Sequence, residues 1–221
     1  MIDSLIDKQD TFEIVRDQIA FILASESVSQ MALAVLAAKD PDDWKLNVYT
    51  ERSNAFEQFL SEDPEPTPIV NIWYDNSNFD KSSSNIMERQ KSETIYNIDC
   101  YGYGVASSDG GSGHNPGDRE AAFEVQRTLR LVRNILMAAT YTHLDLQGIV
   151  WTRWTQSITA FQPELSGTQY EQVQAIRLAL QVDFNEFSPQ VTPEELELIH
   201  VDVKRTGDGK IIVDAEYDYT L

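Results

Sequence analysis

Residues 94–104 read TIYNIDCYGYG, and they are followed by a Gly/Ser-rich loop, a long amphipathic helix and two long alternating strands that end near Phe184. Within this stretch Tyr96, Ile98 and Cys100 alternate with polar residues, which predicts a strand with one buried face and one face that is wetted or paired. The order strand, loop, helix, strand, strand decides the fold. It contains no recognisable catalytic centre.

The helix and strands downstream of the loop are clearly patterned. Asp118 is a suitable N-cap, and an apolar stripe over residues 122–139 predicts a helix that packs on the sheet. Residues 149–161 and 169–184 read as strands, and the second has the cleanest alternation in the chain. In that strand the apolar positions should face the core.

Upstream of the opening stretch, Asp10 and Glu13 form a capping-box pattern, and apolar residues then recur at three and four positions, which predicts a helix. The polar run 25–29 interrupts this pattern. The apolar residues 31–38 then form either a second helix or a buried continuation. Further predicted features are a half-buried strand at 44–49, an acidic Pro-rich linker at 61–68, a strand at 69–74 and a polar connection at 75–91.

These elements predict an α+β fold, with a mainly antiparallel sheet packed against two principal helices. Residues 198–204 and 210–217 alternate around the turn sequence TGDG, which predicts a C-terminal β-hairpin appendage. We therefore expect a main domain at 1–187 and a C-terminal extension at 188–221.

Composition limits the classes of function. The 221 residues include 17 Lys+Arg and 36 Asp+Glu, so the formal charge of -19 disfavours general attraction to nucleic acid or to an anionic membrane. A single cysteine excludes an intrachain disulfide framework, and three histidines form no zinc-ligand spacing. The N-terminus lacks a signal-peptide pattern, and no 18 apolar residues run together. We expect a soluble cytosolic chain without a cofactor and without a membrane partner.

Candidate catalytic motifs fail on their spacing. Gly102 and Gly104 follow a strand, but the third glycine of a dinucleotide fingerprint would fall at Ser107, where no helix begins. Gly110 and Ser112 approach a nucleophile-elbow pattern, yet the required final glycine is replaced by His114. A small hydrolase that uses Ser112 and His114 is the enzymatic alternative, and we expect no enzyme.

Two groups of residues are candidates for interfaces. Arg127, Arg130 and Arg133 repeat every three residues on the predicted long helix, where they bind an anionic neighbour or form an exposed face paired with Glu124. Trp and Arg are enriched at protein interfaces. The second group lies on one predicted strand and consists of Trp151, Arg153 and Trp154.

The two tryptophans differ by three positions, so a regular strand places them on opposite faces. One is then expected in the core and the other against another chain or an added helix. The loop residues Gly110, Ser112 and His114 are further interface candidates, because a Gly/Ser-rich segment without bulky residues can become ordered on a neighbour.

The order of elements over residues 12–187 resembles that of the tail-terminator and neck proteins of tailed bacteriophages. The similarity is carried by the YNIDCYGYG strand, by the helix that opens with Asp-Arg-Glu-Ala at 118–121, and by the two long strands that follow. The ending at 202–217 also resembles those of phage neck and tail proteins. These are patterns of order and not catalytic signatures.

The resemblance implies a virion protein that forms a ring, usually of six copies, on the last layer of the tail tube. Such a ring stops tube polymerisation, meets the neck or connector protein and lets DNA pass without specific binding. Its location would be the tail or neck of the virion, and the host cytoplasm during assembly. An acidic lumen would repel phosphate, although the charge equally keeps an unassembled subunit soluble. A sheath, a collar or the connector are the alternative partners of the C-terminal hairpin, and an adaptor without ring symmetry is the alternative function.

Overall fold

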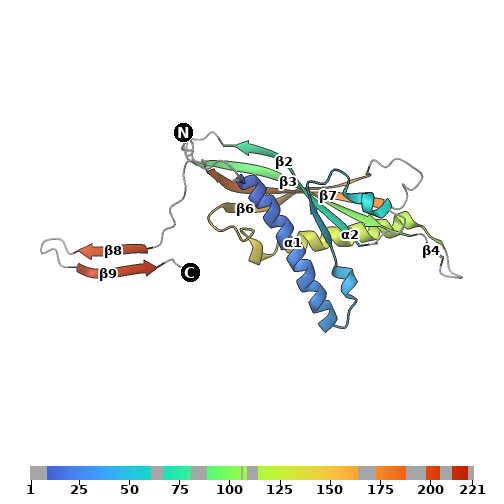
Figure 1. Cartoon of the computed structure of the whole chain (residues 1–221), viewed down its shortest axis with the longest axis horizontal. Helices are drawn as coiled ribbons and strands as arrows, with labels where there is room; N and C mark the ends of the chain where they lie inside the picture. Colours follow the sequence, from blue (N-terminus) through green and yellow to red (C-terminus); the bar gives the residue numbers. More distant parts are fainter. Residues whose placement is uncertain are drawn as a thin grey trace. The chain divides into compact units, whose positions relative to one another are not determined.

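The computed structural model describes residues 9–60, 67–80, 89–105, 107–108, 114–163, 173–187, 198–204 and 211–218. The chain divides into two units, Ser4–Ser188 and a smaller unit formed by Met1–Asp3 with Pro189–Leu221, and each is described by itself. The elements of the larger unit are α1 (Thr11–Leu36), η1 (Pro41–Trp44), β1 (Asn47–Thr50), η2 (Ala55–Leu60), β2 (Ile69–Phe79), β3 (Arg89–Tyr103), β4 (Ser107–Ser108), β5 (His114–Asn115), α2 (Gly117–Leu136), η3 (Ala139–Tyr141), β6 (Val150–Phe161) and β7 (Val173–Phe187) (Figure 1).

The centre of the larger unit is a five-stranded sheet with the order β1-β2-β3-β7-β6. The β2–β3, β3–β7 and β7–β6 pairs are antiparallel, and the short β1 pairs parallel to β2. With its two helices, this sheet confirms the predicted α+β class. Strands β3 and β7 pair without a register shift along the whole of β3, from Arg89 to Tyr103.

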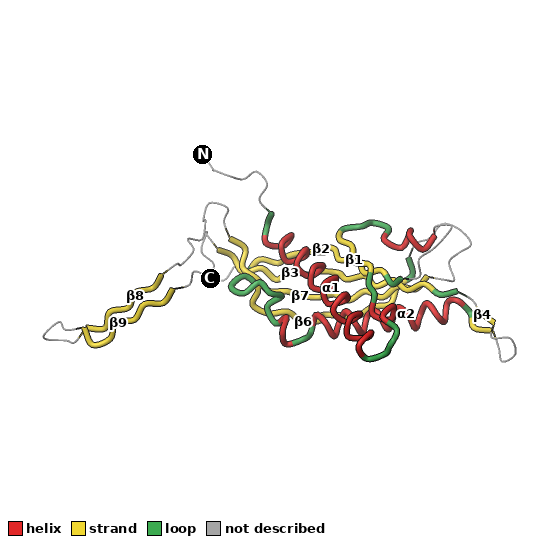
Figure 2. Tube along the Cα trace, turned by 60° about the horizontal axis from the view of Figure 1, so that its bottom comes forward, coloured by secondary structure: helices red, strands yellow, loops and turns green. Residues whose placement is uncertain are grey.

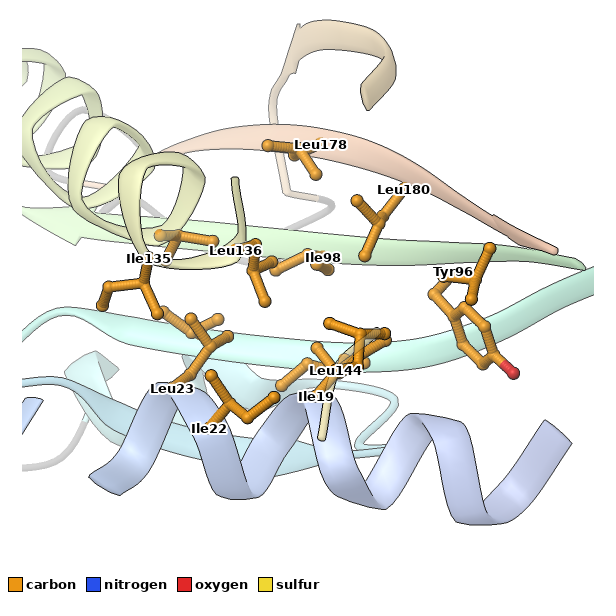
Figure 3. Close-up of a cluster of buried hydrophobic side chains, with 14 of the residues drawn as sticks. Ile19, Ile22, Leu23, Tyr96, Ile98, Ile135, Leu136, Leu144, Leu178 and Leu180 are labelled. Carbon is orange, nitrogen blue, oxygen red and sulfur yellow. The ribbon is translucent and has the colours of Figure 1, made fainter. Parts of the chain in front are cut away.

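Both helices pack on one face of the sheet (Figure 2). In β7, Leu178, Leu180, Val182 and Phe184 are each at most 1% exposed and face this layer, as the alternation predicted. Figure 3 shows side chains from α1, α2 and the strands meeting in one cluster. The contributors from α1 are Val15, Ile19, Ile22 and Leu23, and those from α2 are Val125, Val132, Ile135 and Leu136.

Helix α1 is continuous, so the interruption predicted at 25–29 is wrong. Its capping box is present as predicted, with Asp10 and Glu13 bonded reciprocally to backbone N–H groups. The second alternative, a buried continuation over 31–38, is wrong in its burial: Leu33, Val35 and Leu36 are 55%, 61% and 84% exposed.

The opposite face of the sheet is covered at one end only by a smaller apolar cluster. Ala55, Phe56 and Phe59 of η2 pack there against residues of β2, β3 and β7, including Tyr101. The Phe59 and Tyr103 rings stack with centroids 5.4 Å apart. The rest of this face carries mainly polar side chains, together with Trp73 and Trp154.

Helix α2 begins one residue before the predicted cap. Its N-cap is Pro116, and Asp118 lies in the first turn, where a carboxylate interacts favourably with the helix dipole. The buried stripe is shifted by one residue at its start, from Ala122 to Ala121, and Ala139 lies beyond the helix in η3. The prediction that this helix packs on the sheet is confirmed.

Several predicted boundaries also shift. Trp44 belongs to η1, so the strand predicted at 44–49 is reduced to β1. Strands β2 and β3 extend into the predicted polar connection, which leaves only residues 80–88 between them. Most of the predicted linker, residues 61–66, lies outside the described residues. In the smaller unit, β8 (Leu198–Lys204) and β9 (Ile211–Asp218) pair antiparallel as a hairpin.

Candidate interaction surfaces

Strand β6 forms one edge of the sheet, and its exposed apolar residues make the first candidate surface. Trp151, Trp154 and Ile158 are 53%, 38% and 46% exposed. Two register shifts in the β6–β7 ladder, at 150/152 and 155/157, interrupt the regular alternation of the strand. Trp154, opposite Gln181, lies on the sheet face away from the helices, whereas Ile158, opposite Leu178, lies on the helix side. The exposed side chains therefore flank the edge on both faces, and we call the three the β6 edge. The prediction that one tryptophan lies in the core is therefore wrong.

Arg153 does not belong to this exposed surface. Its position in the ladder, opposite Val182, places it on the helix side of the sheet. There the guanidinium donates hydrogen bonds to the carbonyl oxygens of Leu136, Thr142 and Ala138, the last two at 3.0 and 2.6 Å. These carbonyls lie at and just beyond the end of α2, where helical partners are lacking and a cation is favourable. Burial lowers the pKa of Arg153. Arg153 is thus a cap for α2.

Replacing Arg153 by methionine should destabilise the larger unit by about 2 kcal/mol, because bonds between a charged donor and the end carbonyls are lost while the aliphatic packing is kept. Urea denaturation followed by circular dichroism measures this change. Arg130→Met, at an exposed position of α2, is the matched control and should lie within about 0.5 kcal/mol of wild type. Equal stabilities of the two variants would contradict the capping role.

The three candidate arginines of α2, Arg127, Arg130 and Arg133, are not gathered into one site. Arg127 forms ion pairs with Asp43 of η1 and with Glu124, the latter at 2.7 Å, so the pairing alternative holds for this residue. Arg130 and Arg133 are exposed on the same helix. An anion-binding role for Arg130 and Arg133 stays a prediction.

The candidates in the Gly/Ser-rich loop lie mostly outside the described residues. Gly110 and Ser112 lie outside the described residues, and of His114 only the backbone is described, within β5. An interface role for these three residues stays a prediction. Cys100 is buried, as the alternation predicted, and burial raises the pKa of its thiol, so it is not a reactive nucleophile.

A polar cavity of about 520 Å³ opens on the sheet face that lies away from the helices. Its floor is the carboxylate of Asp99, which accepts hydrogen bonds from Arg177 Nε and Nη2 at 2.7 and 2.9 Å and from Trp73 Nε1 at 2.9 Å. The Tyr101 hydroxyl also bonds to Asp99, and burial raises the pKa of Tyr101. Arg177 lies over the rings of Trp73 and Phe161, 4.7 and 5.0 Å from their centroids.

Asp99 in this cavity accepts hydrogen bonds from several protein donors, and Arg177 is held in a bidentate pair over two aromatic rings. The arrangement stabilises the β3–β7 strand pair and commits the Asp99 carboxylate to hydrogen bonds within the protein. Sequence reasoning missed this cluster. The available signal was the charged pair Asp99 and Arg177 at polar positions of two strands otherwise rich in apolar residues.

The second candidate surface is the side of α1 that faces away from the sheet. Phe21, Val28 and Val35 recur every seven residues, which places them in one line along the helix, and they are 64%, 68% and 61% exposed. Leu33 and Leu36, which are also exposed, lie elsewhere around the helix near its C-terminal end. We call Phe21, Val28 and Val35 the outer face of α1. The sequence signal at its C-terminal end was the almost continuous apolar character of residues 31–38, for which a second helix and a buried continuation were the two alternatives.

Helix α1 is also long and apolar enough to span a membrane by length and composition, with a mean hydropathy of 1.7 in its most apolar 18-residue window. The core helix of a soluble protein satisfies the same criteria. Here Val15, Ile19 and Leu23 are fully buried against the sheet, so one side of α1 has a partner within the unit.

Over the part of the chain that the structure describes, no group of three or more His, Cys, Asp or Glu side chains converges as a metal site would require. The exposed apolar residues of β6 and α1 are the two candidate interaction surfaces. No protein-family model matches this chain, and a search of curated proteins finds no similar sequence.

Proposed function

We propose that this protein is a structural component of a phage virion, a tail terminator that self-associates into a ring, of six copies by the resemblance, at the end of the tail tube. The ring joins the tube to the neck or connector protein and lets DNA pass. The observation that supports self-association most strongly is the β6 edge, where a twelve-residue edge strand carries three large exposed apolar side chains.

A long edge strand is a hazard for a protein that remains monomeric, because its N–H and C=O groups can pair with another chain. Monomers commonly protect such edges with charged side chains, proline or a covering element. Strand β6 contains no proline, and its single charged residue, Arg153, is directed to the end of α2. Exposed tryptophans at such an edge are typical of a surface that is buried on assembly.

The charge of the chain is consistent with this role. With 36 acidic against 17 basic residues, a ring of several copies would present a strongly negative surface overall. DNA phosphates would be repelled from such a surface and would slide past it instead of binding. We expect no measurable affinity for duplex DNA at physiological salt.

A growth assay on tail tubes tests the proposal. Tubes polymerised from the tube protein of the same phage should stop lengthening when this chain is added at about one ring per tube end, because a terminator occupies the growing end. Trp154→Glu should abolish the arrest, since a charge at the β6 edge opposes burial. The elongation is followed by light scattering and by tube lengths in negative stain.

The matched control is Phe123→Glu, which changes a 58% exposed aromatic residue on α2, outside the β6 edge. This variant should arrest tubes as wild type does. Tubes that lengthen equally with and without the wild-type chain would contradict the terminator role. A capped end without rotational symmetry would favour the adaptor alternative.

A further inference from the structure

The outer face of α1 and the β6 edge lie on different parts of the same unit. Helix α1 packs mainly against η1, β1, β2 and α2. In the sheet order β1-β2-β3-β7-β6, strands β1 and β2 occupy the edge opposite β6. Helix α1 lies over one face of the sheet and β6 forms an edge of it, so the two exposed apolar surfaces are carried by different elements (Figures 1 and 2).

Both surfaces are nearly free of charge, although the chain as a whole is strongly acidic. From Ile19 to the end of α1 the only charged residue is Glu26, whose carboxylate accepts hydrogen bonds from Tyr141 and Gln30 at 2.5 and 3.3 Å. Strand β6 contains no acidic residue. Two copies that each carry a charge of -19 repel one another over most of their surface, so close approach is least opposed where these two uncharged areas meet.

We infer that the outer face of α1 in one copy packs against the β6 edge of the next copy, in a head-to-tail contact. The inference rests on the proposed function and names the two surfaces that would build its ring. A contact between two different surfaces of the same chain repeats from copy to copy and closes into a ring when the rotation allows it. A two-fold contact, in which a surface meets its own copy, would end at a dimer.

The size of the surfaces suits such a contact. The three side chains of the outer face of α1 expose on the order of 300 Å² of apolar surface, taking roughly 100 Å² for each side chain. A stable interface buries about 800 Å² on each partner, of which a little over half is apolar. The outer face of α1 thus supplies most of the apolar area that one side of a standard interface needs.

A bilayer is a poorer occupant of the outer face of α1. Helices that lie on membrane surfaces carry basic residues on their polar side, whereas α1 has no basic residue in its last turn and the chain is acidic. Insertion across the membrane would also separate Ile19, Ile22 and Leu23 from the core. Flotation with vesicles of mixed phosphatidylcholine and phosphatidylglycerol checks this: co-flotation of the wild-type chain would overturn the assignment.

Two variants that each block one surface test the contact directly. Val28→Glu places a charge on the outer face of α1, and Ile158→Glu places one on the β6 edge; both sites are exposed, so the fold should be kept. Each variant alone should be monomeric. An equimolar mixture at about 100 μM should give a species of twice the 25.1 kDa subunit mass and nothing larger, because each partner retains one intact surface that faces the other.

Native mass spectrometry and sedimentation velocity measure these species, with Phe123→Glu as the control that should behave as wild type. The failure of the inference and that of the proposed function are distinguishable. A mixture that stays monomeric, while the wild-type chain forms rings, overturns the assignment of the two surfaces only. A mixture that forms the dimer, with a wild-type chain that leaves tail tubes uncapped, supports the contact and removes the terminator role.

Discussion

Asp99→Ala is expected to cost about 3 kcal/mol of folding free energy, because one carboxylate satisfies several donors at once. Its side chain is 4% exposed and pairs with Arg177, which keeps about a third of its own surface in water. That partial exposure of Arg177 places the expected loss at the lower end of the range for broken buried pairs. The Trp73 indole N–H would also lose its acceptor.

Urea denaturation at pH 7 gives the value for Asp99→Ala. Asp99→Asn should cost less, since an amide oxygen still accepts one hydrogen bond but no longer neutralises Arg177. Asp42→Ala, at an exposed carboxylate of η1, is the control and should change stability by less than about 0.5 kcal/mol. An Asp99→Ala variant as stable as the Asp42→Ala variant would contradict the role given to this cluster.

Gly102→Val is expected to separate α2 from the sheet and to prevent cooperative folding of the larger unit. A Cβ atom at Gly102 would lie 2.6 Å from the carbonyl oxygen of Ala121 and 2.6 Å from the amide nitrogen of Val125, and both are backbone atoms of α2. A side chain can rotate away from such a contact, but a helix backbone must shift as a whole. Far- and near-ultraviolet circular dichroism, with thermal denaturation, measures the outcome.

Gly148→Ala is the comparison variant. It distinguishes a steric clash of the added side chain, expected at Gly102, from backbone strain at a position where only glycine is favourable. Gly148 has a φ of +86°, with no heavy atom within 4 Å of its would-be Cβ, so alanine there is strained only through its backbone. We expect a loss of about 1–2 kcal/mol with the fold intact. If Gly102→Val were no worse than Gly148→Ala, the close approach of α2 to β3 would be refuted.

The tertiary hydrogen bonds of Ser27 explain why the continuity of α1 is hard to predict from the sequence. The run 25–29 has the composition of a helix interruption, but Ser27 is buried, donates to the carbonyl oxygen of Trp44 at 2.8 Å and accepts from the Leu46 amide at 3.0 Å. These bonds attach the segment before β1 to the helix. A polar residue with a distant tertiary partner has the same local pattern as one that ends a helix.

The local elements were predictable because hydrophobic alternation and helical spacing are properties of neighbouring residues, as in β7 and α2. The side chains that are exposed or paired at the candidate sites were not predictable from such local patterns. Bulges in β6 changed the exposure of Trp151 and Trp154, and nothing in the alternation of the strand marks them. The Asp99–Arg177 pair depends on the register between strands that are about 75 residues apart in the chain.

The most direct test of the proposed function is negative-stain imaging of the purified chain, alone and mixed with tail tubes of the same phage. We predict closed rings of identical copies seated on tube ends, with the tryptophan-bearing β6 edge buried between neighbours. Images that show only single copies in solution and bare tube ends after mixing would contradict the proposal that this chain is a ring-forming tail terminator.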